Sequence, residues 1–143
     1  MLVKLLPDQV ARHWEIIRRS IEESDFSLPG ESKEKMNNML EEFLVGKRQA
    51  WISYNSEKVV NGVVTTQIQE DKIAEIKSVL IYSVYSFGEA DMKDWYEGFR
   101  ALKKFAKGEG CSYFYAFSNN DFIIDISNRL GGDTSRRLVL IPV

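Results

Sequence analysis

The sequence predicts one α/β domain built on a sheet that mixes antiparallel and parallel strands. Two β-rich stretches, residues 49–54 and 59–69, flank a turn and predict a hairpin. A third strand follows at Ile73 to Tyr85; it first alternates polar and apolar residues and is then almost entirely apolar, as in a strand covered on both faces. A glycine-bearing turn, an amphipathic helix and another strand come next. This crossover predicts that the flanking strands are parallel.

Length and composition limit the classes of function. The 143 residues suit a single domain, which we expect to span residues 1–143, and 44% hydrophobic with 28% charged residues is ordinary for a globular protein. A net charge of −2 argues against a broad nucleic-acid-binding surface. No apolar run reaches the ~18 residues of a membrane span. One cysteine and one histidine offer neither an internal disulfide nor a metal centre. We therefore expect a soluble, cytoplasmic protein with no metal, no nucleic-acid partner and no membrane association.

A short strand at residues 2–6 and two helices at residues 8–24 and 32–46 are expected before the hairpin. Asp8 is placed either to cap the first helix or to serve as an acid in its first turn, and Gly46 to end the second. Within the hairpin, residues 55–58 form the turn. Asn61-Gly62 indicates a β-bulge or a close backbone approach.

The second half of the chain predicts a helix at residues 91–107, a strand at 112–117, a short helix at 122–130 and a final strand at 136–143. The first of these helices begins with acidic residues and ends with basic ones, an order that its dipole favours. Gly108 and Gly110 are stop signals for this helix.

Several side chains have both a structural and a functional interpretation. His13 is either a surface or boundary residue or a catalytic group, although no partner motif surrounds it. Met36 and Met39 are either core residues or a deformable substrate wall. Cys111 is most simply a small buried apolar group.

The predicted order, β-α-α-β-β-β-α-β-α-β, resembles the fold of the GCN5-related N-acetyltransferases (GNAT) over essentially the whole chain. More narrowly, the sequence resembles the small GNAT-like proteins of tailed bacteriophages. Three stretches carry that similarity: LLPDQVARHW at residues 5–14, VVNGVVTT at 59–66 and EGCSY at 109–113.

The resemblance implies a loop that binds acetyl-CoA between the fourth predicted strand, at residues 73–85, and the helix after it. The family motif is Gln/Arg-x-x-Gly-x-Gly/Ala, whose backbone N–H groups and helix dipole hold a pyrophosphate. Here the loop reads YSFGEA, so Gly88 and Ala90 match while Tyr85 replaces the basic or amide residue. Glu89 and Asp91 add negative charge, and a like charge ~5 Å from a phosphate costs about 3 kcal/mol. The alternative interpretation is a glycine turn followed by acidic helix caps.

The resemblance also implies residues outside this loop. The acyl carbonyl would meet backbone N–H groups of a bulged strand centre near residues 78–80. An Asn after the next strand corresponds to Asn119 or Asn120, and the family's proton-donating Tyr falls on Ile126 or Ser127. The implied cofactor-binding residues are Val79, Ile81, Tyr85, Gly88, Glu89, Ala90 and Asn120.

Ser127 is the implied proton donor to the leaving thiolate, although a mid-helix polar residue explains it equally. Glu75 is the one acid on the predicted central strand, and the resemblance makes it the candidate general base for an amine. Its alternative is a solvent-facing residue paired with Lys58 or Lys77. The aromatic residues of the two strands either wall an acyl pocket or belong to the core; they are Tyr82, Tyr85, Phe87, Tyr113, Phe114, Tyr115 and Phe117.

Two functions follow as expectations. The first is an acetyl-CoA-dependent N-acetyltransferase whose amine substrate is a small molecule or a protein. The second is a non-catalytic GNAT-fold protein of a phage virion, of its assembly or of host interaction, which would form a homo-oligomer or bind a phage protein. If phage-encoded, the protein would reside in the host cytoplasm or in the virion.

Overall fold

A single mixed sheet organises the protein, as the sequence predicts. The computed structural model describes residues 1–24, 28–88 and 90–143. The strands pair in the order β1-β2-β3-β4-β5. The pairs from β1 to β4 are antiparallel, and β4 pairs with β5 in parallel. Their bounds are β1 (Leu2–Lys4), β2 (Arg48–Tyr54), β3 (Val60–Asp71), β4 (Ile76–Ser86) and β5 (Tyr113–Tyr115).

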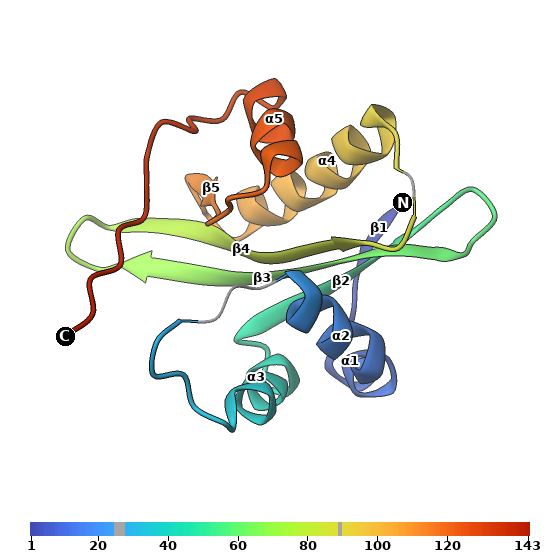
Figure 1. Cartoon of the computed structure of the whole chain (residues 1–143). Helices are drawn as coiled ribbons and strands as arrows, with labels where there is room; N and C mark the ends of the chain where they lie inside the picture. Colours follow the sequence, from blue (N-terminus) through green and yellow to red (C-terminus); the bar gives the residue numbers. More distant parts are fainter. Residues whose placement is uncertain (25–27, 89) are drawn as a thin grey trace.

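Helices cover both faces of this sheet (Figure 1). Those on one face are α1 (Pro7–Arg12), α2 (Trp14–Ser24) and α3 (Lys35–Leu44). Those on the other are α4 (Met92–Gly108) and α5 (Asp121–Arg129). Because α4 connects the parallel strands β4 and β5, the predicted crossover is confirmed.

The first predicted helix is interrupted at His13, which separates α1 from α2. The His13 backbone N–H donates to the carbonyls of Gln9 and Val10, at 3.0 and 3.1 Å. Its ring Nδ1 lies 2.8 Å from the Gln9 carbonyl oxygen, and because that oxygen can only accept, Nδ1 carries the proton. His13 is thus a half-buried residue that ends a helix.

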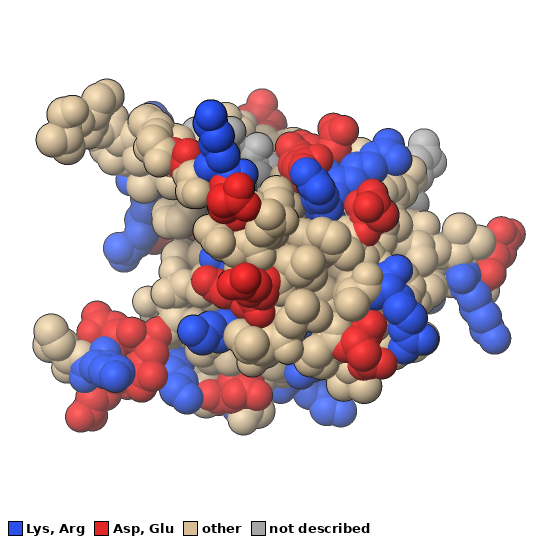
Figure 2. Space-filling view, turned by 90° about the horizontal axis from the view of Figure 1, so that it is seen from below, with Lys and Arg blue, Asp and Glu red and all other residues tan. Residues whose placement is uncertain are grey.

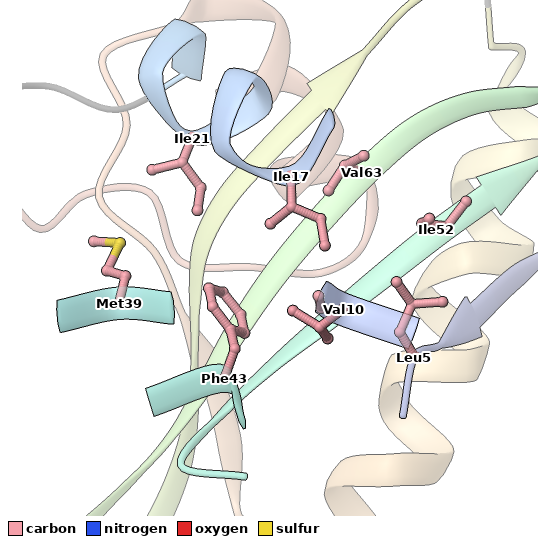
Figure 3. Packing of buried hydrophobic residues seen from close by; sticks show 9 residues of the cluster. Leu5, Val10, Ile17, Ile21, Met39, Phe43, Ile52 and Val63 are labelled. Atoms are coloured by element: carbon pink, nitrogen blue, oxygen red, sulfur yellow. The ribbon is translucent and has the colours of Figure 1, made fainter. Parts of the chain in front are cut away.

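The main hydrophobic core lies between the sheet and the helices α1 to α3 (Figure 3). Both methionines on α3 belong to it: Met39 is buried, and Met36 packs against the cluster. They are core residues and not the wall of a pocket. The buried members are Leu5, Val10, Ile17, Ile21, Met39, Phe43, Ala50, Ile52 and Val63.

The bulge predicted at Asn61-Gly62 is confirmed. Ser53 pairs with Gly62 and Tyr54 with Val60, so Asn61 is the extra residue on β3. Gly62 is also a point of close approach, since a Cβ there would lie 3.1 Å from the backbone oxygen of Tyr85.

The final strand predicted at residues 136–143 does not form. Every residue from 131 to 143 is exposed, and within the described chain this segment pairs with no strand. Gly131, with φ of +86°, ends α5, and the chain then leaves the sheet.

The surface over α1 to α3 mixes both signs of charge (Figure 2). This face therefore has no positive stripe of the kind that follows a nucleic-acid backbone. Among the described residues, no helix combines the length and apolarity that crossing a membrane requires.

Candidate functional site

Strands β4 and β5 run side by side for only three residue pairs. Ser78, Val79 and Leu80 pair with Tyr113, Phe114 and Tyr115, after which β5 ends while β4 continues to Ser86. Among the described residues, nothing pairs with the β5-facing backbone edge of residues 81–86. We call this unpaired strand edge the β4 cleft edge. An unpaired strand edge offers N–H and C=O groups to an extended ligand.

A β-bulge lies on this edge at Tyr82. Thr66 pairs with Ile81 and Thr65 with Ser83, so Tyr82 is the extra residue. The sequence-based expectation placed the bulge near residues 78–80, and this is wrong, because those residues are paired on both sides. Of the two strand residues expected at the cofactor, Val79 lies within that doubly paired segment. Ile81 lies on the β4 cleft edge.

The predicted glycine loop follows directly at the end of β4. The Phe87 N–H donates to the Asn61 carbonyl at 2.9 Å, and the rings of Tyr85 and Phe87 meet edge to face at 4.9 Å. Gly88 is exposed, and a Cβ built on it would touch nothing within 4 Å. Glu89 lies outside the described residues. The Tyr85 ring thus packs against Phe87 of the glycine loop, and the space next to the Gly88 Cα is open.

Acidic side chains cap the N-terminus of α4. Asp91 Oδ1 accepts from the Asp94 N–H at 2.9 Å, and Asp94 Oδ2 accepts from the Asp91 N–H at 3.3 Å. This reciprocal arrangement is a capping box, and both carboxylates are exposed. The acidic-cap interpretation is therefore correct for Asp91. Two of the N–H groups that could hold an anion already have partners, whereas Lys93 adds one positive charge in the same turn.

Two residues whose backbones contact this loop each carry a buried side-chain atom with no hydrogen-bond partner among the described residues: Asn61 Oδ1 and Trp95 Nε1. Both residues contact the loop through their backbones, since Asn61 accepts from Phe87 and Trp95 donates to Asp91. Buried polar groups without partners are rare and often face a ligand or water. Here they supply one acceptor and one donor.

Asn120 is the N-cap of α5. Its side-chain oxygen accepts from the N–H groups of Phe122 and Ile123, at 3.0 and 3.3 Å. The structure therefore distinguishes Asn120 from Asn119, whose side chain does not cap the helix. The amide nitrogen of Asn120 remains the part that could serve a cofactor.

Glu75 does not lie on the central strand. It occupies the turn between β3 and β4 with φ of +54°, because Asp71 accepts from the N–H groups of Ile73 and Ala74 and so delays the start of β4 to Ile76. At ~3.3 Å per residue, β4 alone is roughly 30 Å long, and Glu75 and Gly88 lie beyond its opposite ends. An open hollow of about 500 Å³ adjoins it, at the end of the sheet away from the glycine loop. The prediction of Glu75 as a strand-borne base is corrected by this placement.

Ser127 lies in α5 and is half-buried. Its hydroxyl donates to the Ile123 carbonyl at 2.8 Å, one turn earlier. A Cβ on Gly132 would lie 2.9 Å from the Ser127 carbonyl oxygen, so the chain also turns tightly around this residue. The hydroxyl proton is directed at the backbone of its own helix, as the mid-helix polar interpretation expects.

Tyr115 is the residue that sequence reasoning did not single out. It forms the last β5 pair, opposite Leu80, at the point where the strands separate. Burial, and to a smaller extent Tyr113, raises the pKa of the Tyr115 phenol, which is already protonated at neutral pH as an ordinary tyrosine. The sequence alone does not set Tyr115 apart from the neighbouring aromatic residues. Its position becomes apparent only from the pairing of β5 with β4. The other aromatic residues divide: Phe114 packs on Phe99 of α4, at 5.3 Å between ring centroids, while Phe117 is about half exposed.

Several solved structures with this fold are described as acetyltransferases. The chain aligns over 100% of its length with a probable acetyltransferase, at 9% identity, 97% coverage of that chain and a TM-score of 0.73. It aligns equally fully with the aminoglycoside acetyltransferase AAC(6')-Iy in complex with the bisubstrate analogue CoA-S-monomethyl-acetylneamine, at 14% identity, 97% coverage and a TM-score of 0.73. A ribosomal-protein-alanine N-acetyltransferase from Brucella melitensis biovar Abortus 2308 matches at 7% identity, 99% coverage and a TM-score of 0.69.

These identities establish the fold alone: the protein has the mixed α/β fold of the GNAT acetyltransferases. No family model and no curated protein sequence matches the chain.

Proposed function

We propose that this protein is an N-acetyltransferase that transfers acetyl from acetyl-CoA to an amine, on a small molecule or a protein. One observation carries the proposal. The β4 cleft edge, bulged at Tyr82, leads directly into an open glycine loop at the N-terminus of α4. Extended backbone, open loop and helix terminus together suit a long ligand with an anionic segment. Two of the solved structures with this fold are described as complexes with CoA or a CoA-containing analogue.

The residues present fit the cofactor in shape better than in charge. The loop around Gly88 and Ala90 would receive the pyrophosphate, with Lys93 as the nearby cation and Trp95 Nε1 as a buried donor. Ile81 and the rest of the β4 cleft edge would pair with the pantetheine arm, and the Asn120 amide nitrogen would lie toward it. The Asp91–Asp94 pair opposes the phosphates, so we expect weak affinity.

Acetyl-CoA supplies, when bound, a thioester whose carbonyl carbon an amine can attack. A C–N bond then forms, the C–S bond breaks, and the thiolate needs a proton. The Tyr115 phenol, which lies where β4 and β5 separate, is our candidate donor in place of Ser127, and solvent would return its proton. The amine loses its own proton to solvent, because Glu75 is remote.

Calorimetry with acetyl-CoA tests the proposal, using two matched variants. Gly88→Ala places a methyl group where the loop would meet phosphate; since a Cβ has free space there, stability should hold while affinity falls at least several-fold. Asp91→Ser keeps a capping side chain and removes one charge, so affinity should rise about two- to fivefold, equivalent to ~0.3–1 kcal/mol. The absence of binding heat at millimolar acetyl-CoA for all three proteins would rule out the proposal.

A non-catalytic role is the alternative, as a GNAT-fold virion, assembly or host-interaction protein of a phage. The acidic capping box favours it, because the helix terminus is already satisfied by the chain's own side chains. In that case acetyl-CoA binds none of the variants, and the protein instead co-purifies with phage particles or a phage protein. A protein that binds acetyl-CoA and acetylates an amine, with Tyr115→Phe lowering turnover, excludes this alternative.

A further inference from the structure

We propose that the amine substrate is a small amine attached to a flat aromatic group, and that the Phe117 ring holds this group beside the β4 cleft edge. The inference rests on the proposed function, since it names the substrate class of the same site. Two features carry it. An exposed aromatic ring continues β5 past the point where β4 and β5 separate, and the residues on both sides of that point are uncharged.

A row of three aromatic rings follows β5 on the face away from α4. Phe114 packs on Phe99 of α4, and because side chains alternate along a strand, Tyr113 and Tyr115 lie on the opposite face. Phe117 continues the row. The ring centroids of Tyr113 and Tyr115 are 6.3 Å apart, and those of Tyr115 and Phe117 are 5.8 Å apart. Tyr113 and Phe117 are 52% and 49% exposed, so each leaves ring surface for a ligand.

The two exposed rings differ in what lies beside them. Tyr113 is opposite Ser78, within the segment where β4 and β5 are paired. Phe117 comes two residues after Tyr115, the last paired residue of β5. Because the two strands are parallel, Phe117 lies in the direction in which the β4 cleft edge continues. An amine near the Tyr115 phenol, the candidate proton donor, can therefore place an attached ring on Phe117 but not on Tyr113.

Both strands lack charged side chains around this point. Residues 78–88, from the paired part of β4 through the glycine loop, contain no Asp, Glu, Lys or Arg, and neither do residues 111–120 around β5. A polycationic amine needs carboxylates to replace the water that it loses on binding, because an unpaired charge is costly to desolvate. A flat aromatic group needs only apolar contact and a ring to pack against. The composition of these segments therefore favours an aromatic amine over a polyamine.

The ion pairs beside Tyr82, the bulged residue of the β4 cleft edge, add no net charge. Lys35 Nζ and Arg48 Cζ lie 5.9 and 4.9 Å from the centre of the Tyr82 ring. Each cation is paired with a glutamate, Lys35 with Glu31 at 2.9 Å and Arg48 with Glu42 at 2.8 Å. These pairs therefore bring no excess of negative charge that could anchor a polycation.

Steady-state acetylation kinetics with three amines test the substrate class. 2-Phenylethylamine and 2-cyclohexylethylamine have the same chain and similar size and basicity, so the comparison isolates the flat ring. At saturating acetyl-CoA, kcat/KM for 2-phenylethylamine should exceed that for 2-cyclohexylethylamine about two- to tenfold, the range expected for an aromatic pair. It should also exceed kcat/KM for spermidine. An equal or larger value for 2-cyclohexylethylamine or for spermidine overturns the proposal.

Two leucine variants locate the binding ring. Phe117→Leu keeps an apolar side chain at an exposed position and removes the aromatic ring. It should raise KM for 2-phenylethylamine about two- to tenfold and leave kcat unchanged, because the contact is the same in the ground state and the transition state. Tyr113→Leu removes the other exposed ring and is the matched control, which should keep the preference for the phenyl compound. An unchanged preference in Phe117→Leu, or an equal loss in Tyr113→Leu, contradicts the assignment.

Calorimetry with acetyl-CoA separates this inference from the proposed function. Wild-type and Phe117→Leu proteins should bind acetyl-CoA with the same affinity, because Phe117 belongs neither to the glycine loop nor to β4. The absence of acetyl-CoA binding overturns the proposed function and the substrate class with it. Acetyl-CoA binding together with acetylation that favours spermidine or a lysine-containing peptide leaves the proposed function standing and overturns the aromatic substrate alone.

Discussion

Two buried hydroxyl groups form a hydrogen bond between β3 and β4 next to the bulge at Tyr82. Thr65 and Ser83, which are 1% and 4% exposed, share a hydrogen bond of 2.5 Å between β3 and β4. Thr65→Val preserves shape but leaves the Ser83 hydroxyl without this partner, and an unsatisfied buried group costs about 1–3 kcal/mol. Urea unfolding should therefore show a clear loss of stability for Thr65→Val. The double variant Thr65→Val/Ser83→Ala should recover most of it. Additive losses in the double variant would show that the two groups are not coupled.

Cys111 should be an unreactive thiol. Burial raises its pKa, Lys77 opposes that rise through its positive charge, and Glu109 adds to it. Because the thiolate is the nucleophile, the pH midpoint for alkylation should lie above the ~8.5 of an ordinary cysteine. Glu109→Gln should lower that midpoint and Lys77→Gln should raise it, as measured by iodoacetamide labelling against pH. Shifts in the same direction for both variants would contradict this account.

At the scale of single elements, the N-cap of α5 gives Asn119 and Asn120 different expected effects on stability. Asn120 caps the helix through two N–H groups, while Asn119 precedes it. Replacing an Asn cap by Ala costs ~0.5–2 kcal/mol, so Asn120→Ala should lower the thermal midpoint. Asn119→Ala is the matched control and should leave it within error. Equal effects of the two substitutions would remove Asn120 from the capping role.

Elements whose signals are local could be predicted from the sequence. Asn61-Gly62 indicated its own bulge, and the acidic start and basic end of α4 marked that helix within a residue of its observed bounds. Glu75 was misplaced because the Asp71 side chain, by capping the turn, decides where β4 begins. The position of the bulge at Tyr82 depends on how the residues of β4 pair with those of β3. The apolar pattern of β4 alone carries no information on that pairing.

The candidate site divides in the same way. Gly88 and its loop could be located by motif, since a glycine turn between a strand and a helix is a local feature. The significance of Tyr115 depends on where β5 stops pairing with β4, and that is a property of two distant segments. The tail at residues 136–143 has every local property of a strand. Propensity alone does not make a strand, because a strand also needs a neighbouring strand to pair with, and in the described chain residues 131–143 pair with none.

At the scale of the whole molecule, the two helical layers contribute different numbers of buried apolar residues. The layer of α1 to α3 contributes Val10, Ile17, Ile21, Met39 and Phe43 to the buried core. On the opposite face, α4 contributes Leu102 and Ala106, and α5 contributes Ile126 as its one buried residue among those described. Regions with fewer buried apolar contacts open at lower free energy. We therefore expect α5 to open before the sheet does.

Hydrogen exchange on two phenylalanine variants tests this inequality. Phe43 is 2% exposed in the core, so Phe43→Ala should cost about 3–5 kcal/mol and accelerate exchange throughout, including the amides of β3. Phe122 on α5 is 53% exposed and meets Trp95 edge to face at 5.7 Å, so Phe122→Ala should cost ~1 kcal/mol. Its effect should be confined to the α5 amides and leave those of β3 unchanged. If the α5 and β3 amides of the wild-type protein exchange with the same free energy, the two layers open as one unit and the inequality is wrong.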